Sequence, residues 1–286
     1  MERQLWMTAL PDSKHLAELS IPGTHDSAAY RNDLPGLGFA QTQQWTITQQ
    51  LDNGVRFFDL RARVIDDNLV MHHGAVYLKM SLNDVLIDLE RFVIAHPGEA
   101  LIVLLKEEHD RENSEMEFHQ IFAEKIMPGR EQYYFLEPRL PTLGELRGKI
   151  FLIRRFGQYP HGFPARWQDK AHFSFSHNGD QVHVQDVYGT YTPFDFTSKR
   201  GEVEQHLSAA RDGAPHELYI NYLSVSGALT PYNGAYGDAF TDGMTLWFNR
   251  QYKGTQATRM GVIVADYVDL NGGELIDTVI YSNLGH

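Results

Sequence analysis

Two histidine-bearing stretches of this sequence contain the residue types that acid–base chemistry needs. The segment Leu19–Tyr30 reads LSIPGTHDSAAY, so His25 and Asp26 follow a short apolar run and a Pro-Gly turn. The stretch LVMHHG ends a second apolar run with His72 and His73. Histidine can accept and donate a proton near neutral pH, because its ordinary pKa is about 6.5. Whether either pair is reactive depends on the elements that present it.

Short apolar runs, rich in β-branched and aromatic residues, predict eight strands. They are Leu19–Pro22, Val55–Leu60, Leu69–His72, Ala100–Leu105, Ile150–Arg154, Val182–Val187, Leu218–Leu223 and Gly261–Ala265. Most of these runs are continuous rather than alternating, which is typical of strands buried on both faces of a parallel sheet. Segments with helical period lie between them. They are Gln43–Leu51, Ser81–Ala95, Met116–Ile126, Arg200–Arg211, Met244–Tyr252 and Glu274–Tyr281.

Strands that alternate with helices along the chain predict the α/β class. Eight strands in roughly 250 residues match the size of a (β/α)8 TIM-type barrel. No low-complexity linker or internal repeat divides the 286 residues, so we expect a single domain over residues 1–286. The stretches Phe156–Val182 and Ser224–Asp242 are long and aromatic, and they contain Gly and Pro. Such long connections are usually functional or mobile.

The composition excludes several classes of protein. Lys and Arg number 25 against 37 Asp and Glu, a net charge of −12, which disfavours nucleic acid as a partner. With no cysteine, the chain has neither disulfides nor thiolate metal sites. No apolar run reaches the roughly 18 residues of a membrane-spanning helix. The first residues do not read as a signal peptide, so we expect a cytoplasmic protein or a secreted one whose signal has been removed.

Polar residues at the C-terminal ends of barrel strands converge on one site. The predicted strand ends supply two histidines together with aspartates, arginines, a lysine and a tyrosine. They are His25, Asp26, Asp59, Arg61, His73, Lys106, Arg155, Asp186, Tyr188 and Asp266. Cationic side chains beside a paired base and acid are suited to a phosphate ester. The sequence therefore predicts an acid–base site that handles phosphate.

The motifs SIPGTHDS, FFDLRAR followed by LVMHHG, LLKEE and VIVADY occur in this order between Leu19 and Tyr267. This ordered set resembles bacterial phosphatidylinositol-specific phospholipase C. The resemblance implies a distorted (β/α)8 barrel that cleaves phosphatidylinositol, and often glycosylphosphatidylinositol anchors. The products would be diacylglycerol and inositol 1,2-cyclic phosphate. The expected partner is phosphatidylinositol at a membrane surface, and the expected location is outside the cell.

The chemistry of that reaction is an intramolecular transfer, in which the inositol 2-hydroxyl attacks the neighbouring phosphorus. The resemblance implies that His25 is the general base and that Asp266 fixes its tautomer. It makes His73 the general acid that protonates the diacylglycerol oxygen, with assistance from Asp26. Of the two adjacent histidines, we expect His72 to point away from the site.

The remaining site residues would bind charge and hydroxyls. The resemblance implies that Arg61 binds the non-bridging phosphate oxygens and that Asp59 holds Arg61 from behind. The residues that match the inositol-binding positions are Lys106, Arg155, Asp186 and Tyr188. We expect Arg63 to be structural, and we expect Glu107 and Glu108 to be solvated or to support other site residues.

Eukaryotic relatives use calcium where this sequence has arginine, with ligands that map near Asp26, Asp59, Arg61 and Lys106. Two of these four positions are cationic here, and calcium needs oxygen ligands. We therefore expect no metal cofactor. The alternatives are a calcium-dependent phosphodiesterase on the same barrel, and a non-catalytic module that binds inositol phosphate or glycan. A glycerophosphodiester or sphingomyelin phosphodiesterase is a further alternative, but it would need a metal cluster at the strand ends.

Two segments with apolar and aromatic residues among glycines flank this predicted site. They are Leu34–Phe39 and Ser226–Phe240. An enzyme that acts on lipid needs an amphipathic rim to enter the headgroup region. The same residues could equally pack on the mouth of the barrel, and the sequence leaves both interpretations open. It does not predict the oligomeric state.

Overall fold

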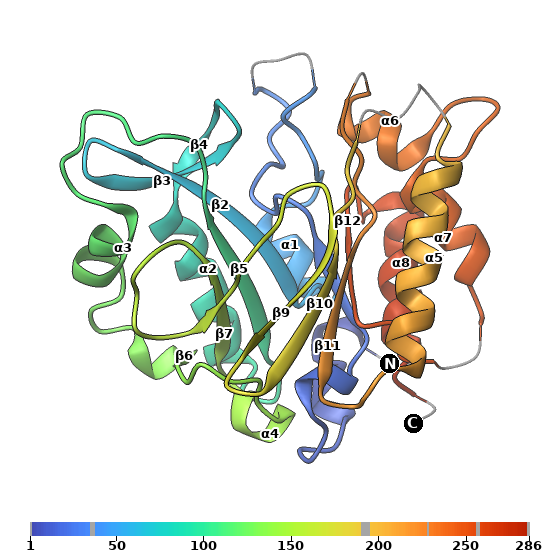
Figure 1. Ribbon diagram of the computed structural model, residues 1–286, viewed down its shortest axis with the longest axis horizontal. Helices are drawn as coiled ribbons and strands as arrows, with labels where there is room; N and C mark the ends of the chain where they lie inside the picture. Colours follow the sequence, from blue (N-terminus) through green and yellow to red (C-terminus); the bar gives the residue numbers. More distant parts are fainter. Residues whose placement is uncertain (1, 35–37, 190–194, 228, 256–257, 285–286) are drawn as a thin grey trace.

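The computed structural model describes residues 2–34, 38–189, 195–227, 229–255 and 258–284. Its centre is one sheet, most of which follows a single path of neighbouring strands (Figure 1). The strands of that path are β1 (Ile21–Thr24), β2 (Phe57–Ile65), β5 (Leu101–Glu107), β6 (Tyr134–Phe135), β7 (Ile150–Arg155), β9 (His172–His177), β10 (Asp180–Gln185), β11 (Glu217–Tyr222) and β12 (Val262–Ala265).

The order along this path is β6-β7-β5-β2-β1-β12-β11-β10-β9. Each neighbouring pair from β6 to β10 is parallel, and β9 closes the path as the antiparallel partner of β10. The sheet curls on itself (Figure 1), but within the described residues no pairing joins β6 to β9. The predicted α/β barrel is confirmed, in its distorted form.

The strand predicted over Leu69–His72 exists, but it is not a parallel strand of the barrel. It is β3 (Asn68–His73), which pairs antiparallel with both β2 and β4 (Val76–Ser81). The two residues between β2 and β3 are Asp66 and Asp67, with φ of 51° and 55°. Two successive residues with positive φ make a tight hairpin, whereas a parallel crossover needs a dozen residues or more. β3 therefore runs back along β2 and returns His73 toward the barrel mouth.

Helices cover the sheet between its strands, as the alternation predicts. They are α1 (Ile47–Asp52), α2 (Leu82–Ala95), α3 (Phe118–Ile121), α4 (Leu143–Leu146), α5 (Thr197–Asp212), α6 (Pro231–Tyr236), α7 (Met244–Tyr252) and α8 (Leu270–Tyr281). At the start of α2, Ser81 and Asp84 form a capping box, which satisfies two free backbone amides. The segment predicted as a helix over Met116–Ile126 is divided into α3 and a π-helical turn, Phe122–Ile126.

The two long connections contain more regular structure than the sequence indicates. Phe156–Val182 includes the short strand β8 (Phe163–Pro164) and all of β9, and Ser224–Asp242 includes α6. By contrast, residues 101–105 of β5 are all buried, in keeping with their continuous apolar run. The rigid parallel strands fix where each chain segment leaves the sheet, and their C-terminal ends lie at the end of the barrel that carries α6 (Figure 1).

Candidate active site

A cavity of about 250 Å³ lies at the C-terminal ends of the parallel strands. It is lined by His25, Arg61, His73, Gly74, Lys106, Glu108, Asp186, Tyr188 and residues 224–226. Six of the ten residues predicted for the site are in this lining. Asp26, Asp59 and Asp266 are buried and contact lining residues from behind. The tenth, Arg155, lines a neighbouring cavity.

The pairing of β1 with β12 brings His25 to Asp266. Thr24 is in register with Ala265, so the residues that follow each strand leave the sheet side by side. The Nδ1 of His25 lies 2.7 Å from Oδ1 of Asp266. A carboxylate only accepts hydrogen bonds, so Nδ1 carries the proton and donates it, and Nε2 is left as the basic nitrogen. The amide of Gln43 holds both turns by donating to the backbone carbonyls of His25 and Ala265.

His73 stands across from His25, with ring centroids 6.1 Å apart. Its Nδ1 donates to the carbonyl of Ala40 at 2.9 Å and lies 3.9 Å from Oδ2 of Asp26. Both histidines thus have Nδ1 engaged with an acceptor, which leaves each Nε2 available. Burial lowers the pKa of His73, and the charge of Arg61 adds to this effect. These two effects favour the neutral form of His73.

Asp26 is fully buried and has a backbone φ of 39°. Neither of its carboxylate oxygens has a hydrogen-bond partner among the described residues. Burial raises its pKa to about 8, although the positive charges of Arg61 and His25 oppose that shift. A buried carboxyl without a hydrogen-bond donor resists ionisation. This carboxyl can therefore hold a proton near neutral pH.

Asp59 is equally buried but behaves in the opposite way. Arg61 donates to it through Nη2 at 3.0 Å, and the hydroxyl of Tyr222 lies 3.4 Å away. Burial acts to raise the pKa of Asp59, but the charges of Arg61 and His25 outweigh it and hold that pKa at about 2. The Nε of Arg61 is only 4.0 Å from Asp26 as well. The guanidinium is thus held between two carboxyl groups beside the cavity.

The strand ends of β10 and β7 bring Asp186 and Arg155 to the same tryptophan. The indole Nε1 of Trp167 donates to Asp186 at 2.9 Å, and the guanidinium of Arg155 lies 4.2 Å above the indole ring. Burial raises the pKa of Asp186, while the Trp167 hydrogen bond and the nearby cations lower it. Arg155 is in register with Lys106 of β5, whereas Arg154 bonds backbone carbonyls of the following loop.

Glu108 supports Lys106, which is one of the two outcomes expected of it, whereas Tyr222 is a residue beside the site that the sequence did not predict. Glu108 is buried, accepts from the backbone N–H of Gly74 at 3.0 Å and pairs with Lys106 at 2.5 Å. Its place directly after a strand was visible, but its burial depends on the position of the β3–β4 hairpin. Tyr222 ends β11 and could have been found as a strand-end residue. His72 is buried, its Nδ1 lies 3.3 Å from the carbonyl of Gly74, and it is not among the lining residues.

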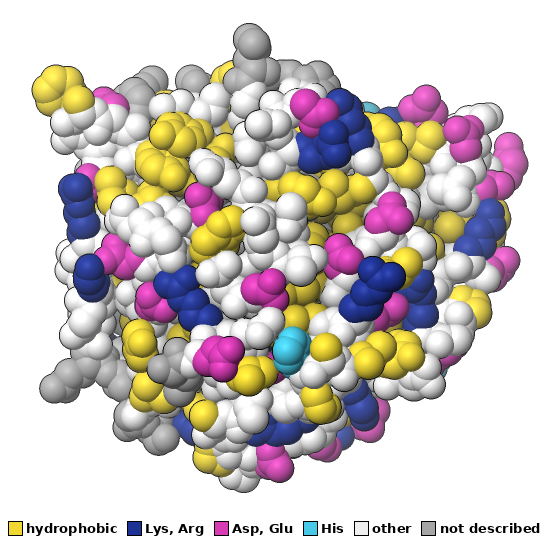
Figure 2. Space-filling view, turned by 180° about the vertical axis from the view of Figure 1, so that it is seen from behind, with side chains coloured by type: hydrophobic (Ala, Val, Ile, Leu, Met, Phe, Trp, Pro, Cys, Tyr) yellow, Lys and Arg dark blue, Asp and Glu magenta, His cyan; other side chains and the backbone are white. Residues whose placement is uncertain are grey.

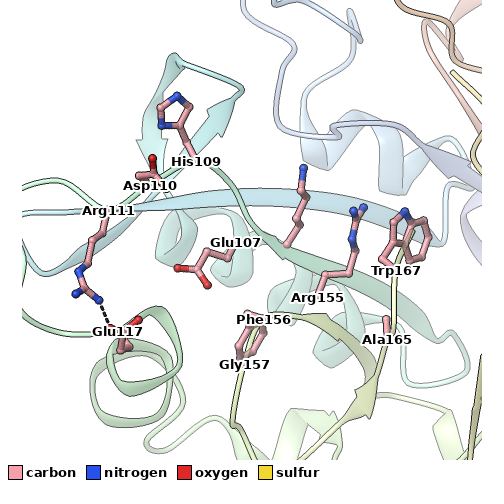
Figure 3. Close-up of a pocket in the computed structure, with 11 residues that line it drawn as sticks. Glu107, His109, Asp110, Arg111, Glu117, Arg155, Phe156, Gly157, Ala165 and Trp167 are labelled. Atoms are coloured by element: carbon pink, nitrogen blue, oxygen red, sulfur yellow. Dashed lines mark hydrogen bonds and ion pairs between the residues drawn. The ribbon is translucent and has the colours of Figure 1, made fainter. Parts of the chain in front are cut away.

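A second cavity, of about 840 Å³, adjoins the first and shares Lys106 with it. Figure 3 shows Arg155 and Trp167 on one side of this cavity and the Arg111–Glu117 ion pair on the other. Glu107 lies between these two groups, and burial raises its pKa. The lining is mostly charged, so this cavity suits a polar ligand rather than an acyl chain.

The fold and the site define a barrel whose mouth holds two opposed histidines and an arginine between carboxylates. Residues 19–156 match the family model of phosphatidylinositol-specific phospholipase C, X domain. The chain is 30% identical to a 1-phosphatidylinositol phosphodiesterase of Staphylococcus aureus (strain Newman), over 97% of this chain and 93% of that protein. It is 39% identical to the 1-phosphatidylinositol phosphodiesterase of Listeria monocytogenes, over 77% of this chain and 68% of that protein.

Solved structures agree with these relatives. The phosphatidylinositol-specific phospholipase C of S. aureus superposes with a TM-score of 0.88 and 30% identity, over 98% of this chain and 97% of that one. The enzyme from L. monocytogenes has a TM-score of 0.77 and 27% identity, over 99% of both chains. The chain therefore belongs to the family of bacterial phosphatidylinositol-specific phospholipases C.

Proposed function

We propose that this protein cleaves phosphatidylinositol to diacylglycerol and inositol 1,2-cyclic phosphate, and that residues 1–286 act as one catalytic domain. The observation that carries the proposal is the opposition of His25 and His73 across one cavity, with both Nε2 atoms available and Arg61 beside them. A module that only binds inositol phosphate has no use for a matched base and acid, so catalysis is the better account.

In the first half of the reaction, Nε2 of His25 takes the proton of the inositol 2-hydroxyl. The freed oxygen attacks the adjacent phosphorus, to which the substrate itself has already positioned it. Asp266 accepts from Nδ1 and stabilises the imidazolium that forms. The guanidinium of Arg61 binds the non-bridging oxygens, where negative charge accumulates, and Asp59 keeps it aimed at them.

In the second half, the bond from phosphorus to the glycerol oxygen breaks as Nε2 of His73 protonates that oxygen. Burial lowers the pKa of His73, and the negative charge of a bound phosphodiester opposes that shift. The ionised form of Asp26, 3.9 Å from His73, stabilises the imidazolium, which takes its proton from solvent before it protonates the glycerol oxygen. Lys106, Arg155, Asp186 and Tyr188 hold the inositol hydroxyls and so orient the ring for attack.

We propose that the reaction needs no metal ion. The described residues contain no group of three or more His, Asp or Glu side chains arranged to hold one. The carboxylates nearest the phosphate site, Asp26 and Asp59, face Arg61 at 4.0 Å and 3.0 Å. A calcium ion there would meet a fixed guanidinium, so these residues do not fit calcium.

The proposed substrate lies in a membrane, and several exposed aromatic residues are available to contact it. Phe39, Tyr232 and Phe240 are exposed, and Phe240, in the loop after α6, is 94% exposed. Residues 35–37 and 228 of the two predicted rim segments lie outside the described residues. No helix within the described ranges is long and apolar enough to cross a bilayer. Secretion stays a prediction from the family resemblance.

Nucleic acid remains an unsuitable partner. Figure 2 shows acidic and basic side chains interspersed on the face behind that of Figure 1, with no continuous basic stripe on it. This face therefore offers no track for a phosphate backbone, and the net charge of −12 disfavours nucleic acid in general.

Glycosylphosphatidylinositol anchors are a second candidate substrate. The 840 Å³ cavity shares Lys106 with the first cavity, and its polar lining gives room for a sugar linked to the inositol ring. Release of an anchored protein from vesicles, scored alongside cleavage of plain phosphatidylinositol, tests this extension. Cleavage of the plain lipid alone would restrict the substrate to phosphatidylinositol.

Phosphorus NMR of phosphatidylinositol in detergent micelles tests the main proposal. With excess chelator, we expect the signal of the five-membered cyclic phosphate to grow. Product that forms only after calcium is added would preserve the reaction and overturn the role given to Arg61. No product under either condition would leave the binding module as the better account.

A further inference from the structure

Lys199, on helix α5, is completely buried, which is rare for a lysine. Its Nζ donates to Oε1 of Gln185 at 3.0 Å and to the backbone carbonyl of Val187 at 2.8 Å. No ion pair within 4.0 Å joins it to a carboxylate of the described chain. Burial lowers its pKa to about 7, while the charge of Asp186 raises it. Its two close partners are thus neutral acceptors on one strand end.

Gln185, the last residue of β10, makes a full set of hydrogen bonds around this lysine. Its Oε1 also accepts from the backbone N–H of Val187 at 2.8 Å. Its Nε2 donates to Oδ1 of Asn221 and to the carbonyl of Tyr222, both at 2.8 Å. The amide of Asn221 returns to α5 by donating to the carbonyl of Val203 at 3.1 Å. A buried, fully bonded network of this kind fixes its members rigidly.

This network holds in place the segment that carries Asp186 and Tyr188. Val187, whose carbonyl Lys199 holds and whose N–H bonds Gln185, lies between these two cavity-lining residues. At the other end of the network, Tyr222 reaches Asp59 through its hydroxyl. The lysine also places a positive charge near Asp186, which counters the effect of burial on the pKa of that carboxyl.

We propose that Lys199 is a positioning residue for substrate binding: it holds the turn after β10 so that Asp186 and Tyr188 meet the inositol hydroxyls. This inference rests on the proposed function. A group that binds the inositol ring equally in the ground state and in the transition state affects KM rather than kcat. A lysine that merely anchored α5 would instead affect the stability of the whole protein.

The test compares Lys199→Met with the wild type, using phosphatidylinositol in detergent micelles and free myo-inositol as a competitive inhibitor. Methionine keeps a similar length and removes the charge and the donors. We expect KM and the inhibition constant of myo-inositol each to rise about tenfold, with kcat within about threefold. Leu207→Ala is the matched control, because it removes buried packing from the same helix at a residue that makes no hydrogen bond in the network. It should lower the melting temperature and leave both constants unchanged.

An unchanged KM in Lys199→Met, or equal shifts in Lys199→Met and Leu207→Ala, would overturn the positioning role while leaving the proposed function intact. A wild-type protein that neither cleaves phosphatidylinositol nor binds myo-inositol would overturn both. If Lys199→Met does not fold, NMR of the wild-type protein with isotope-labelled lysine provides the test. Comparison with the spectrum of Lys199→Arg identifies the resonance of Lys199. The Nζ resonance of Lys199 should shift when myo-inositol saturates the site, and no shift would contradict the proposal.

Discussion

Replacing Asp26 with asparagine should make the protein more stable and a poorer catalyst. Its carboxyl is buried without a hydrogen-bond partner, and burial raises its pKa from an ordinary value of 3.8 to about 8. For an acid with a raised pKa, the stabilising contribution is complete below pH 3.8 and is lost as the pH rises toward 8. At neutral pH, the wild-type protein has therefore lost most of this stabilisation. Asp26→Asn keeps it, because the amide does not ionise.

The size of this stability difference follows from the shift in the pKa of Asp26. Each pH unit inside the window changes the free energy of unfolding by about 1.4 kcal/mol, so the advantage of Asp26→Asn should reach about 4 kcal/mol at pH 7. That figure is an upper limit, since the buried amide also lacks partners. Because Asp26 supports His73, we expect turnover to fall by a factor of about 10 to 100.

Urea denaturation of both proteins at pH 5, 6 and 7 measures this difference. Asp212→Asn is the control, because a hydrogen bond from Arg211 lowers the pKa of Asp212 and this carboxyl is ionised above pH 5 in both the folded and the unfolded state. The difference in the free energy of unfolding between this control and wild type should stay constant over the same pH range. A difference between Asp26→Asn and wild type that is also constant from pH 5 to 7 would refute the reasoning.

Further predictions concern groups around the barrel. His73→Ala should lower turnover about 10²- to 10⁴-fold, whereas His72→Ala, which alters no cavity-lining residue, should change it little; steady-state rates decide whether the right member of the pair is assigned. Burial lowers the pKa of His206 to about 3, so wild-type stability should fall as the pH drops below 6.5, and His206→Phe should reduce that acid loss in urea denaturation at pH 4 and 7. Phe240→Ser should lower the affinity for phosphatidylinositol vesicles, measured by co-sedimentation, about tenfold and leave hydrolysis of a water-soluble substrate unchanged. An unchanged affinity would show that Phe240 does not contact the membrane.

Much of the fold could be predicted because local patterns and tertiary packing agree. Residues 101–105 form a continuous apolar run and become a strand buried on both sides. Ser81 and Asp84 stand three apart before an amphipathic segment and cap α2. The hairpin of β3 was missed because Asp66-Asp67 is not a strong turn signal, although both residues have positive φ. Its length and apolar content resemble those of a barrel strand, and only its pairing distinguishes it.

The site could be predicted to the extent that its residues end strands or match the family motifs. His25 and Asp266 are separated by 240 residues, and only the closing of β1 on β12 brings them to 2.7 Å. Neither local propensity nor periodicity contains that pairing. Tyr222 and Lys199 were not predicted, because the burial of a polar side chain depends on what packs over it.

The assignment of His25 as base and His73 as acid is tested most directly by how the rate of cleavage depends on the leaving group. Two inositol phosphodiesters are compared, one with an alkyl leaving group and one with p-nitrophenol, whose anion leaves without a proton. His73→Ala should be impaired about 10²- to 10⁴-fold on the alkyl ester and nearly recover on the nitrophenyl ester, while His25→Ala should be impaired on both. Equal impairment of His73→Ala on the two esters would contradict the account.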